Sequence, residues 1–403
     1  MARTLATLPA GSRISDYISV GVITSFFPAA KVREVLQQTN RESVRERDLP
    51  AQVVVYHVLA LALYMRSSAR EVLRCLLEGV QWLLDPSVQV KVAGDSGISQ
   101  ARSRLGAEPL RKLYASVVGP IAIESTQGAW YRKWRLVSLD GSTLDVADTA
   151  ENDKAFGRAE SGRGTSAFPK LRFVALLECG THVLWGARMD KYATGEVTLA
   201  DSVVESLRPA MLCLADRLFF SYKLWRKAAS RGAELLWRVK GDLRLEMEQR
   251  LPDGSYLSHV YASSSDRRNG IAVRVIEYRL KGVHGAESLY RLLTTILDPT
   301  QAPATELAAL YHERWEIETA LDELKTHLRG AQIVLRSKTP ELVKQEFLGL
   351  LLTHYAIRSL MHQAALKADE DPDRLSFVHT VHVVQRRLPR WVAIPPSEEE
   401  NLS

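Results

Sequence analysis

Residues 305–329 read TELAALYHERWEIETALDELKTHLR, and their apolar residues recur at the spacing of an α-helix. Thr305 follows Pro303 as a candidate N-cap, and Glu306 lies in the first turn, where the helix dipole favours a negative charge. At about 100° per residue, the helix carries two stripes. The apolar stripe consists of Leu310, Ile317, Leu321, Leu324 and Leu328. The polar stripe consists of Tyr311, Arg314, Glu318, Asp322 and Lys325.

We call residues 305–329 the signature segment. Its apolar stripe predicts the face that packs on a hydrophobic core. The polar stripe runs along the edge of that face, so it would border a cleft. Glu318 then lies at a core boundary, with Arg314 one turn before it and Lys325 two turns after it. The alternative is an exposed helix face with ion pairs four residues apart, each worth a few tenths of a kcal/mol.

The spacing within the polar stripe is more specific than its polarity. Tyr311, Arg314, Glu318 and Lys325 follow the pattern Y-(2)-R-(3)-E-(6)-K without a gap. The segment therefore resembles the signature of the insertion-sequence-four family of DDE transposases. This resemblance implies that Glu318 is the third of three metal-binding carboxylates and that the other three residues contact DNA beside it. It also requires two aspartates earlier in the chain.

Two apolar stretches each lead to an aspartate. RLVSLD is typical of a strand that ends at Asp140, before the turn-forming residues Gly141 and Ser142. A second short strand, residues 211–215, ends before Asp216. An aspartate at a strand end is commonly a turn residue, which is the alternative for each one taken alone. The order Asp140, Asp216, Glu318 is similar to the order of the metal carboxylates in the family.

The resemblance also implies a fold class and a domain division. We expect an α/β fold with a ribonuclease-H-like catalytic core over residues 131–240 and 296–366, interrupted by a β-strand insertion subdomain over residues 241–295. Hairpin signals at 253–254 and 269–270 support strands in that insertion. The helical pattern before the core predicts an all-α domain over residues 1–130, and the resemblance implies that this domain binds DNA ends. Residues 367–403 are expected to form a helical C-terminal region and a tail.

The N-terminal part carries a local excess of positive charge. Residues 99–135 contain seven Lys or Arg and only two acidic residues. We expect Arg102, Arg104, Arg111 and Lys112 to lie on the surface of a helix pair and to contact DNA ends. A solvated helical face without a partner is the alternative.

Three further residues are predicted to contact DNA from the strands. Arg238 and Lys240 are two apart on one strand, so their side chains would face the same way, toward a phosphate backbone. An exposed strand face is the alternative. In the family, a tryptophan near the end of the insertion stacks on a flipped base. The matching position here is Tyr290, whose ring can still stack on a base.

The composition is that of a soluble globular protein. The 403-residue chain is 46% hydrophobic and 25% charged, with a net charge of +6 that weakly favours a polyanionic partner. Its three cysteines have no metal-ligand spacing, so we expect buried thiols in a reducing compartment. The resemblance implies a prokaryotic, cytoplasmic protein that is associated with the nucleoid when bound to DNA. Neither a signal peptide nor an apolar run long enough to span a membrane is present. The sequence contains no Gly-rich phosphate loop, CxxC pair or nucleophile elbow.

The resemblance implies a metal-dependent, cut-and-paste transposase that binds terminal inverted repeats, cleaves the ends through a hairpin and joins them to target DNA. Its partners would be double-stranded DNA and a second copy of the chain in a homodimer. Its cofactor would be two Mg²⁺ ions per site, which Mn²⁺ can replace, because hard cations suit carboxylate oxygens. Two other functions remain open: a metal-dependent nuclease on the same core, and a catalytically silent DNA-binding regulator descended from a transposase.

Overall fold

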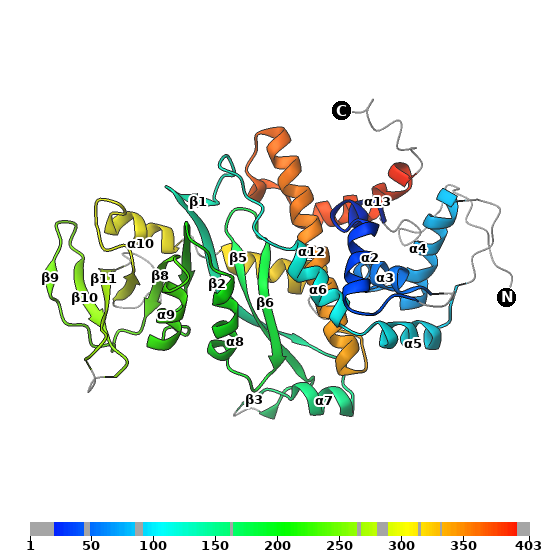
Figure 1. The fold of residues 1–403 in the computed structure, drawn as a ribbon, viewed down its shortest axis with the longest axis horizontal. Coiled ribbons are helices and arrows are strands. Elements are labelled where there is room, and N and C mark those ends of the chain that lie inside the picture. The colour runs from blue at the N-terminus through cyan, green and yellow to red at the C-terminus, as the bar shows by residue number, and fades with distance from the viewer. Residues whose placement is uncertain are drawn as a thin grey trace.

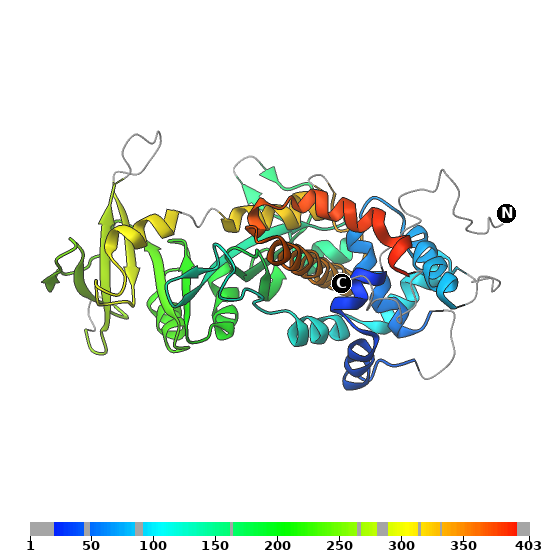
Figure 2. The same cartoon turned by 90° about the horizontal axis from the view of Figure 1, so that it is seen from above.

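The computed structural model describes residues 20–43, 49–84, 92–161, 164–263, 267–279, 289–312, 316–330 and 333–392. One mixed sheet runs through the middle of the molecule, with helices against both faces (Figure 1). Seen from above, the N-terminal helices lie at one end of the long axis and the later strands at the other (Figure 2). The mixed α/β class expected from the sequence is therefore confirmed.

Five strands form the half of the sheet that precedes residue 240. They are β2 (Trp134–Asp145), β5 (Lys170–Glu178), β6 (Leu184–Lys191), β7 (Met211–Ala215) and β8 (Glu234–Val239). Their order is β6-β5-β2-β7-β8, antiparallel across β6, β5 and β2 and parallel across β2, β7 and β8. This arrangement fits a ribonuclease-H-like core. A short strand, β1 (Trp130–Tyr131), pairs with the start of β2, and β3 (Glu160–Ser161) and β4 (Gly164–Thr165) form a separate small ribbon.

The sequence predicts that strand β2 ends at Asp140, and this prediction is wrong. The strand continues through Gly141 and Ser142 to Asp145, because this second half stays paired with β5. Gly141 lies opposite Val174, and a side chain there would come within 2.9 Å of Glu196. Glycine at this position therefore serves close packing within a strand and not a turn.

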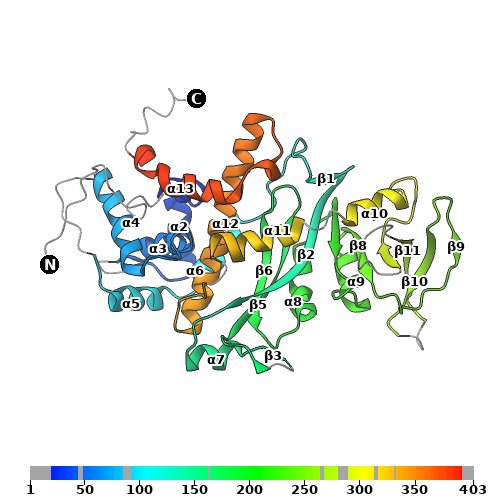
Figure 3. The same ribbon diagram turned by 180° about the vertical axis from the view of Figure 1, so that it is seen from behind.

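Side-chain alternation separates the two faces of the sheet. Val137, Leu139 and Cys213 share a core with α8 (Glu196–Val203) and α9 (Tyr222–Ala229) on the first face. The opposite face, seen in Figure 3, is covered by α11 (Glu316–Asp322) and α12 (Pro340–Ala368). We call it the signature face, because the signature segment packs on it.

The described N-terminal residues form helices only. These are α1 (Val20–Phe26), α2 (Ala29–Gln38), α3 (Ala51–Leu63), α4 (Ala69–Leu84), α5 (Asp95–Leu105) and α6 (Glu108–Val117). Ser68 caps α4, since its hydroxyl accepts a hydrogen bond from the Glu71 amide at 3.1 Å. Helices α3, α5 and α6 pack against α12, so the N-terminal helices and the C-terminal part share one core. The short helix α7 (Ala150–Phe156) lies between β2 and β3.

The strands of the predicted insertion extend the same sheet. They are β9 (Gln249–Arg250), β10 (Tyr256–Val260), β11 (Ile271–Tyr278) and β12 (Tyr290–Thr294), in the order β8-β12-β11-β10-β9. Arg274, fully buried, bonds to Asp253 and to two backbone carbonyls, and Asp253 accepts a bond from the Ala304 amide at 2.8 Å. The hairpin thereby caps the helix that follows it, α10 (Ala304–His312).

The signature segment is not one regular helix. It consists of α10, which begins at Ala304 and not at a Thr305 cap, then α11, then a π-helical turn (Glu323–Leu328). Residues 313–315, Arg314 included, lie outside the described residues. Leu310, Leu321, Leu324 and Leu328 are all buried, as the apolar stripe predicts. In the last turn, residues 323–328, the hydrogen bonding is π-helical, so each turn holds more residues than a turn of α-helix.

The C-terminal part is helical. After α12, a 3₁₀ turn (Pro372–Arg374) leads to α13 (Phe377–Val392), which packs against α12 and α1. Cys179 and Cys213 are buried free thiols. In the part of the chain that the structure describes, no helix has the length and apolarity needed to cross a membrane.

Candidate active site

Asp140 and Asp216 lie side by side on neighbouring parallel strands. The last pair between β2 and β7 is Leu139 with Ala215. Asp140 follows Leu139 within β2, and Asp216 directly follows the last residue of β7. Adjacent strands are about 4.8 Å apart, so the two carboxylates are close neighbours. Because Leu139 and Ala215 point into the core under α8 and α9, alternation turns both aspartates to the signature face.

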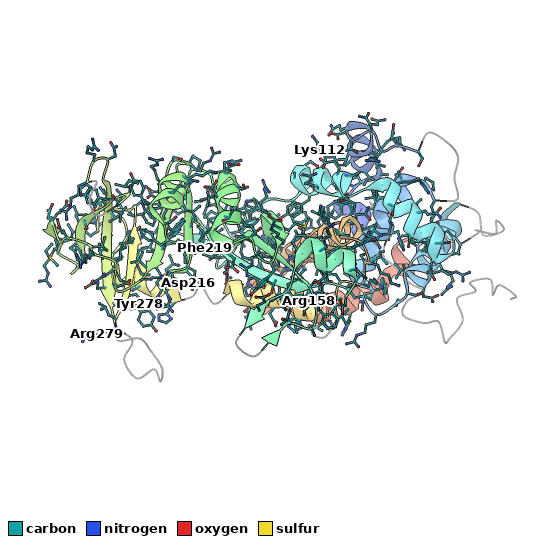
Figure 4. The ribbon with its side chains drawn as sticks, turned by 90° about the horizontal axis from the view of Figure 1, so that it is seen from below. Lys112, Arg158, Asp216, Phe219, Tyr278 and Arg279 are labelled. Carbon is teal, nitrogen blue, oxygen red and sulfur yellow. The ribbon has the colours of Figure 1, made fainter. Side chains whose placement is uncertain are left out.

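Both carboxylates are held in the same way. Each accepts a hydrogen bond from the amide of the residue that follows it, Gly141 at 2.8 Å and Arg217 at 2.6 Å. Both aspartates are half-buried. Figure 4 shows Asp216 near the junction between α10 and α11. The backbone therefore fixes two acidic groups at a sheet position that solvent can reach.

Tyr311 of the signature segment fixes the strand that carries Asp216. Its hydroxyl donates to the Ala215 carbonyl at 3.3 Å, and its ring is buried among Leu212, Leu214 and Leu310. The sequence places Tyr311 in an accessible polar stripe, and the structure corrects this. Its ring belongs to the core, and its contact is with the strand end beside Asp216.

Arg238 is the next residue in the same row. Ala215 pairs with Trp237, so Arg238 lies beside Asp216 and, by alternation, on the signature face. Its guanidinium lies 4.6 Å from the centre of the Tyr290 ring, a cation–π distance. Lys240 is exposed just after β8. The signature face thus presents two carboxylates, a guanidinium and an aromatic ring across β2, β7, β8 and β12.

Two residues that sequence reasoning missed extend this row. Tyr278 stacks on Tyr290 with 5.3 Å between ring centres, and the His312 ring lies against both. Burial raises the pKa of Tyr278 to about 12, so its hydroxyl stays protonated and can donate a hydrogen bond. Tyr278 lies twelve residues before Tyr290 on the paired strand, so only the register of the hairpin, which is unknown from the sequence, brings the rings together.

Helix α11, which contains Glu318, packs against β2. This places the helix on the signature face, over the strand of Asp140. The side chain of Glu318 lies outside the described part of the structure, as does all of Arg314. Within the described side chains, no group of three acidic, histidine or cysteine residues is arranged so that it could hold a metal ion. Lys325 lies in the π-helical turn and is half-buried.

The four predicted N-terminal contacts divide into two kinds. Arg104, Arg111 and Lys112 are exposed on α5 and α6, although Arg111 forms an ion pair with Glu108. Arg102 is buried, so the prediction that it lies on the surface and contacts DNA is wrong. Arg102 is 6% exposed, and its guanidinium donates to Gln345, Ser337 and the Leu342 carbonyl. These partners lie more than 230 residues away, so local sequence carries no signal of them. Figure 4 places Lys112 in the helical half, remote from Asp216 and Tyr278.

Comparison with known proteins gives the same family over most of the chain. Residues 17–115 match the family model described as insertion element 4 transposase N-terminal, and residues 132–355 match the transposase DDE domain. The chain is 27% identical over 370 residues to the transposase InsG for insertion sequence element IS4 of Escherichia coli strain K12, covering 89% of this chain and 80% of that protein. A solved structure of a piggyBac transposase synaptic complex with hairpin DNA aligns with 97% of this chain and 85% of its own chain, at 12% identity and a TM-score of 0.49.

Proposed function

Because the chain belongs to the insertion element 4 family of DDE transposases, we propose that Asp140, Asp216 and Glu318 form the site at which it cuts and joins DNA. A DDE transposase moves an insertion sequence by phosphoryl transfer. The observation that carries the residue assignment is the parallel register of β2 and β7, which sets both aspartates on the face that α11 covers. Glu318 joins them through its place on α11 and through the signature spacing.

The residues present fit divalent cations. Two carboxylates on adjacent strands repel each other unless cations neutralise them, and their hard oxygen atoms suit Mg²⁺ or Mn²⁺. A DDE domain depends on divalent metal, and we propose two Mg²⁺ ions held by Asp140, Asp216 and Glu318. When bound, a metal pair of this kind activates an attacking oxygen and stabilises a leaving oxygen at phosphorus.

The remaining residues of the row bind and orient the nucleic acid. Arg238 presents its guanidinium beside Asp216, where it would pair with a phosphate of the strand being cut. Lys325 and Arg314 supply further cations along the signature segment, and Lys240 supplies one beyond β8. Tyr311 acts indirectly, by holding the Ala215 carbonyl and so the strand end that carries Asp216.

The aromatic pair next to Arg238 suits an unstacked base. Tyr290 already binds a cation on one side and stacks on Tyr278, and His312 closes the group. Because Arg238 and Tyr278 both contact the Tyr290 ring, a base displaced from the duplex near the cut would stack on that ring by displacing one of them. Such a displaced base accompanies end cleavage through a hairpin, which we propose as the route here.

Recognition of the element's ends is assigned to the N-terminal helices. Arg104, Arg111 and Lys112 are exposed cations on the α5–α6 pair. The helical half and the row of the active site lie far apart along the molecule (Figure 2), so one chain can hold the terminal inverted repeat away from the cut. We propose that two copies pair in the complex that joins both ends to target DNA.

A strand-transfer assay tests this function. End DNA carrying a free 3′-OH is mixed with the protein, a supercoiled plasmid and Mg²⁺. Joined products are expected, and Asp216→Asn should give none while still binding the end. Cutting without joining would identify a metal-dependent nuclease, and end binding without either reaction would identify a silent regulator.

A further inference from the structure

A buried ionic cluster holds the last turn of the signature segment. Glu323, the first residue of the π-helical turn, is 4% exposed and bonds to the guanidinium of Arg358 on α12 through two nitrogens, one of them at 2.8 Å. His182, in the turn between β5 and β6, contacts both of them, and its other ring nitrogen lies 3.1 Å from Asp373. His354 lies 3.4 Å from Glu323. We call these five residues the Glu323 cluster.

This cluster joins four separate parts of the chain. Glu323 belongs to the signature segment, Arg358 and His354 to α12, His182 to the β5–β6 turn and Asp373 to the 3₁₀ turn before α13. His182 adopts a left-handed backbone conformation with φ of 57°, which costs energy in a residue with a side chain. Because Arg358 can only donate, the facing nitrogen of His182 accepts, and the other nitrogen carries the proton toward Asp373.

The charge on Glu323 is maintained despite burial. Burial alone raises the pKa of its carboxyl group, but the neighbouring rings of His182 and His354 and the charge of Arg358 outweigh this effect, so the pKa lies well below its usual value. Burial also lowers the pKa of His354, which keeps that ring neutral. The cluster therefore centres on one carboxylate and one guanidinium that neutralise each other.

Glu323 lies where the signature segment changes from α-helix to π-helix. At the α-helical spacing, Glu323 would lie about 130° from the centre of the stripe formed by Leu321, Leu324 and Leu328. The structure buries the stripe and Glu323 together, because α12 and the β5–β6 turn cover the side on which Glu323 lies. The π-helical turn begins at this residue. Rotation per residue is smaller in such a turn than in an α-helix, and the turn sets the direction of Lys325 two residues later.

We propose that Glu323 is a positioning residue whose buried ion pair with Arg358 sets the π-helical turn and thereby aims Lys325 at the DNA. The proposal rests on the DNA contact assigned to Lys325 in the proposed function. Glu323 itself touches no substrate and acts through the helix. The Asp373 and His182 contacts extend this anchor to the C-terminal turn and to the antiparallel edge of the sheet.

The test is a double-mutant cycle on DNA already bound. Single-turnover cleavage is measured with Glu323→Gln, Lys325→Ala and the double variant, each well below its melting temperature. Each single change is expected to slow cleavage by about tenfold or more with little loss of end affinity, since misplaced reacting groups are costly. The double variant is expected to match Lys325→Ala, because a residue that acts only through Lys325 has no effect once Lys325 is absent.

A matched control separates positioning from general stability. Glu178 is also a fully buried carboxylate, paired with Arg135 and with the amides of Ile121 and Ala122, none of which belongs to the signature segment. Glu178 also contacts Thr181 and the His182 amide in the β5–β6 turn, but its hydrogen bonds include neither Glu323 nor Arg358. Glu178→Gln is therefore expected to lower the melting temperature and to leave cleavage within about twofold. Equal slowing by Glu178→Gln and Glu323→Gln would overturn the proposal.

Further outcomes are decisive even if Glu323→Gln fails to fold. The variant Glu323→Met/Arg358→Met replaces the ion pair by apolar side chains, a change that buried pairs often tolerate. Slow cleavage by this folded variant supports the positioning role, and a wild-type rate overturns it. The proposal is also overturned if the double variant slows cleavage by the product of the two single effects. That result leaves the DNA contact assigned to Lys325 intact. A wild-type rate for Lys325→Ala removes both that contact and this inference, while Asp216→Asn still tests the active site independently.

Discussion

Arg102→Ala should destabilise the protein without removing a DNA contact. The guanidinium donates three hydrogen bonds at 3.0 to 3.2 Å, to Gln345, Ser337 and the Leu342 carbonyl, and so joins α5 to α12. Its burial lowers the pKa of Arg102, with the charge of Glu346 opposing that effect. Truncation leaves these buried partners without their donor. We expect a loss of about 3–5 kcal/mol, because each buried acceptor that is left without a donor costs about 1–3 kcal/mol.

Thermal melting and salt-dependent binding measure the two effects separately. At about 2–4 °C per kcal/mol, the melting temperature of Arg102→Ala should fall by at least 6 °C. The dependence of end affinity on salt, measured where the protein is folded, should keep its slope. The neighbouring exposed residue gives the control: Arg104→Ala should melt within about 0.5 kcal/mol of wild type and reduce the salt slope by about 0.9. A stable Arg102→Ala with a reduced slope would refute the reasoning.

Three further predictions concern packing, pH and the tyrosine of the signature. Gly141→Ala places a Cβ within 2.9 Å of the Glu196 side chain, so it should cost about 1–3 kcal/mol and slow cleavage; activity that recovers when Glu196→Ala is added would confirm the clash as the cause. His57 is buried and its pKa is lowered, mainly by burial, from 6.5 to about 4, so the unfolded chain binds the extra proton. Up to about 3 kcal/mol of stability, present above pH 6.5, is therefore lost as the pH falls from 6.5 to 4. The melting temperature of His57→Gln should therefore vary less between pH 7 and pH 5 than that of the wild type, and an equal slope would exclude His57 as the source. Tyr311→Phe loses only the bond to the Ala215 carbonyl, so it should cost about 0.5–1.5 kcal/mol and still slow cleavage of bound ends; an unchanged cleavage rate would show that the bond does not position Asp216.

The parts of the fold that could be predicted from the sequence are those decided by local patterns. Strand β7 occupies the predicted residues, 211–215, because a short apolar run between turn signals leaves little choice. The cap at Ser68 follows from a serine and a glutamate at the right offset. The signature spacing and the order of the two aspartates were likewise visible without coordinates, and the register of β2 and β7 places those aspartates together.

The errors arise where distant contacts override local preference. Gly141 and Ser142 favour a turn, but pairing with β5 keeps them in an extended strand. Helical periodicity assumes a constant rotation per residue, so it could not reveal the π-helical turn or the burial of Glu323. The burial of Arg102 depends on partners on α12, and the stacking of Tyr278 on Tyr290 depends on hairpin register. The local sequence therefore predicts neither the burial of Arg102 nor the stacking of the two tyrosine rings.

The most direct test of the central claim is cleavage of bound end DNA by three isosteric variants, Asp140→Asn, Asp216→Asn and Glu318→Gln. Each removes one charge while keeping the size of the side chain, and melting temperature and end affinity are measured in parallel as controls. If the three carboxylates form one metal site, each change should lower the cleavage rate with Mg²⁺ at least about a thousandfold, since charge stabilisation by metal contributes several kcal/mol to the barrier. Folding and end binding should persist in all three variants. Cleavage near the wild-type rate by any folded variant would contradict the claim and remove that residue from the active site.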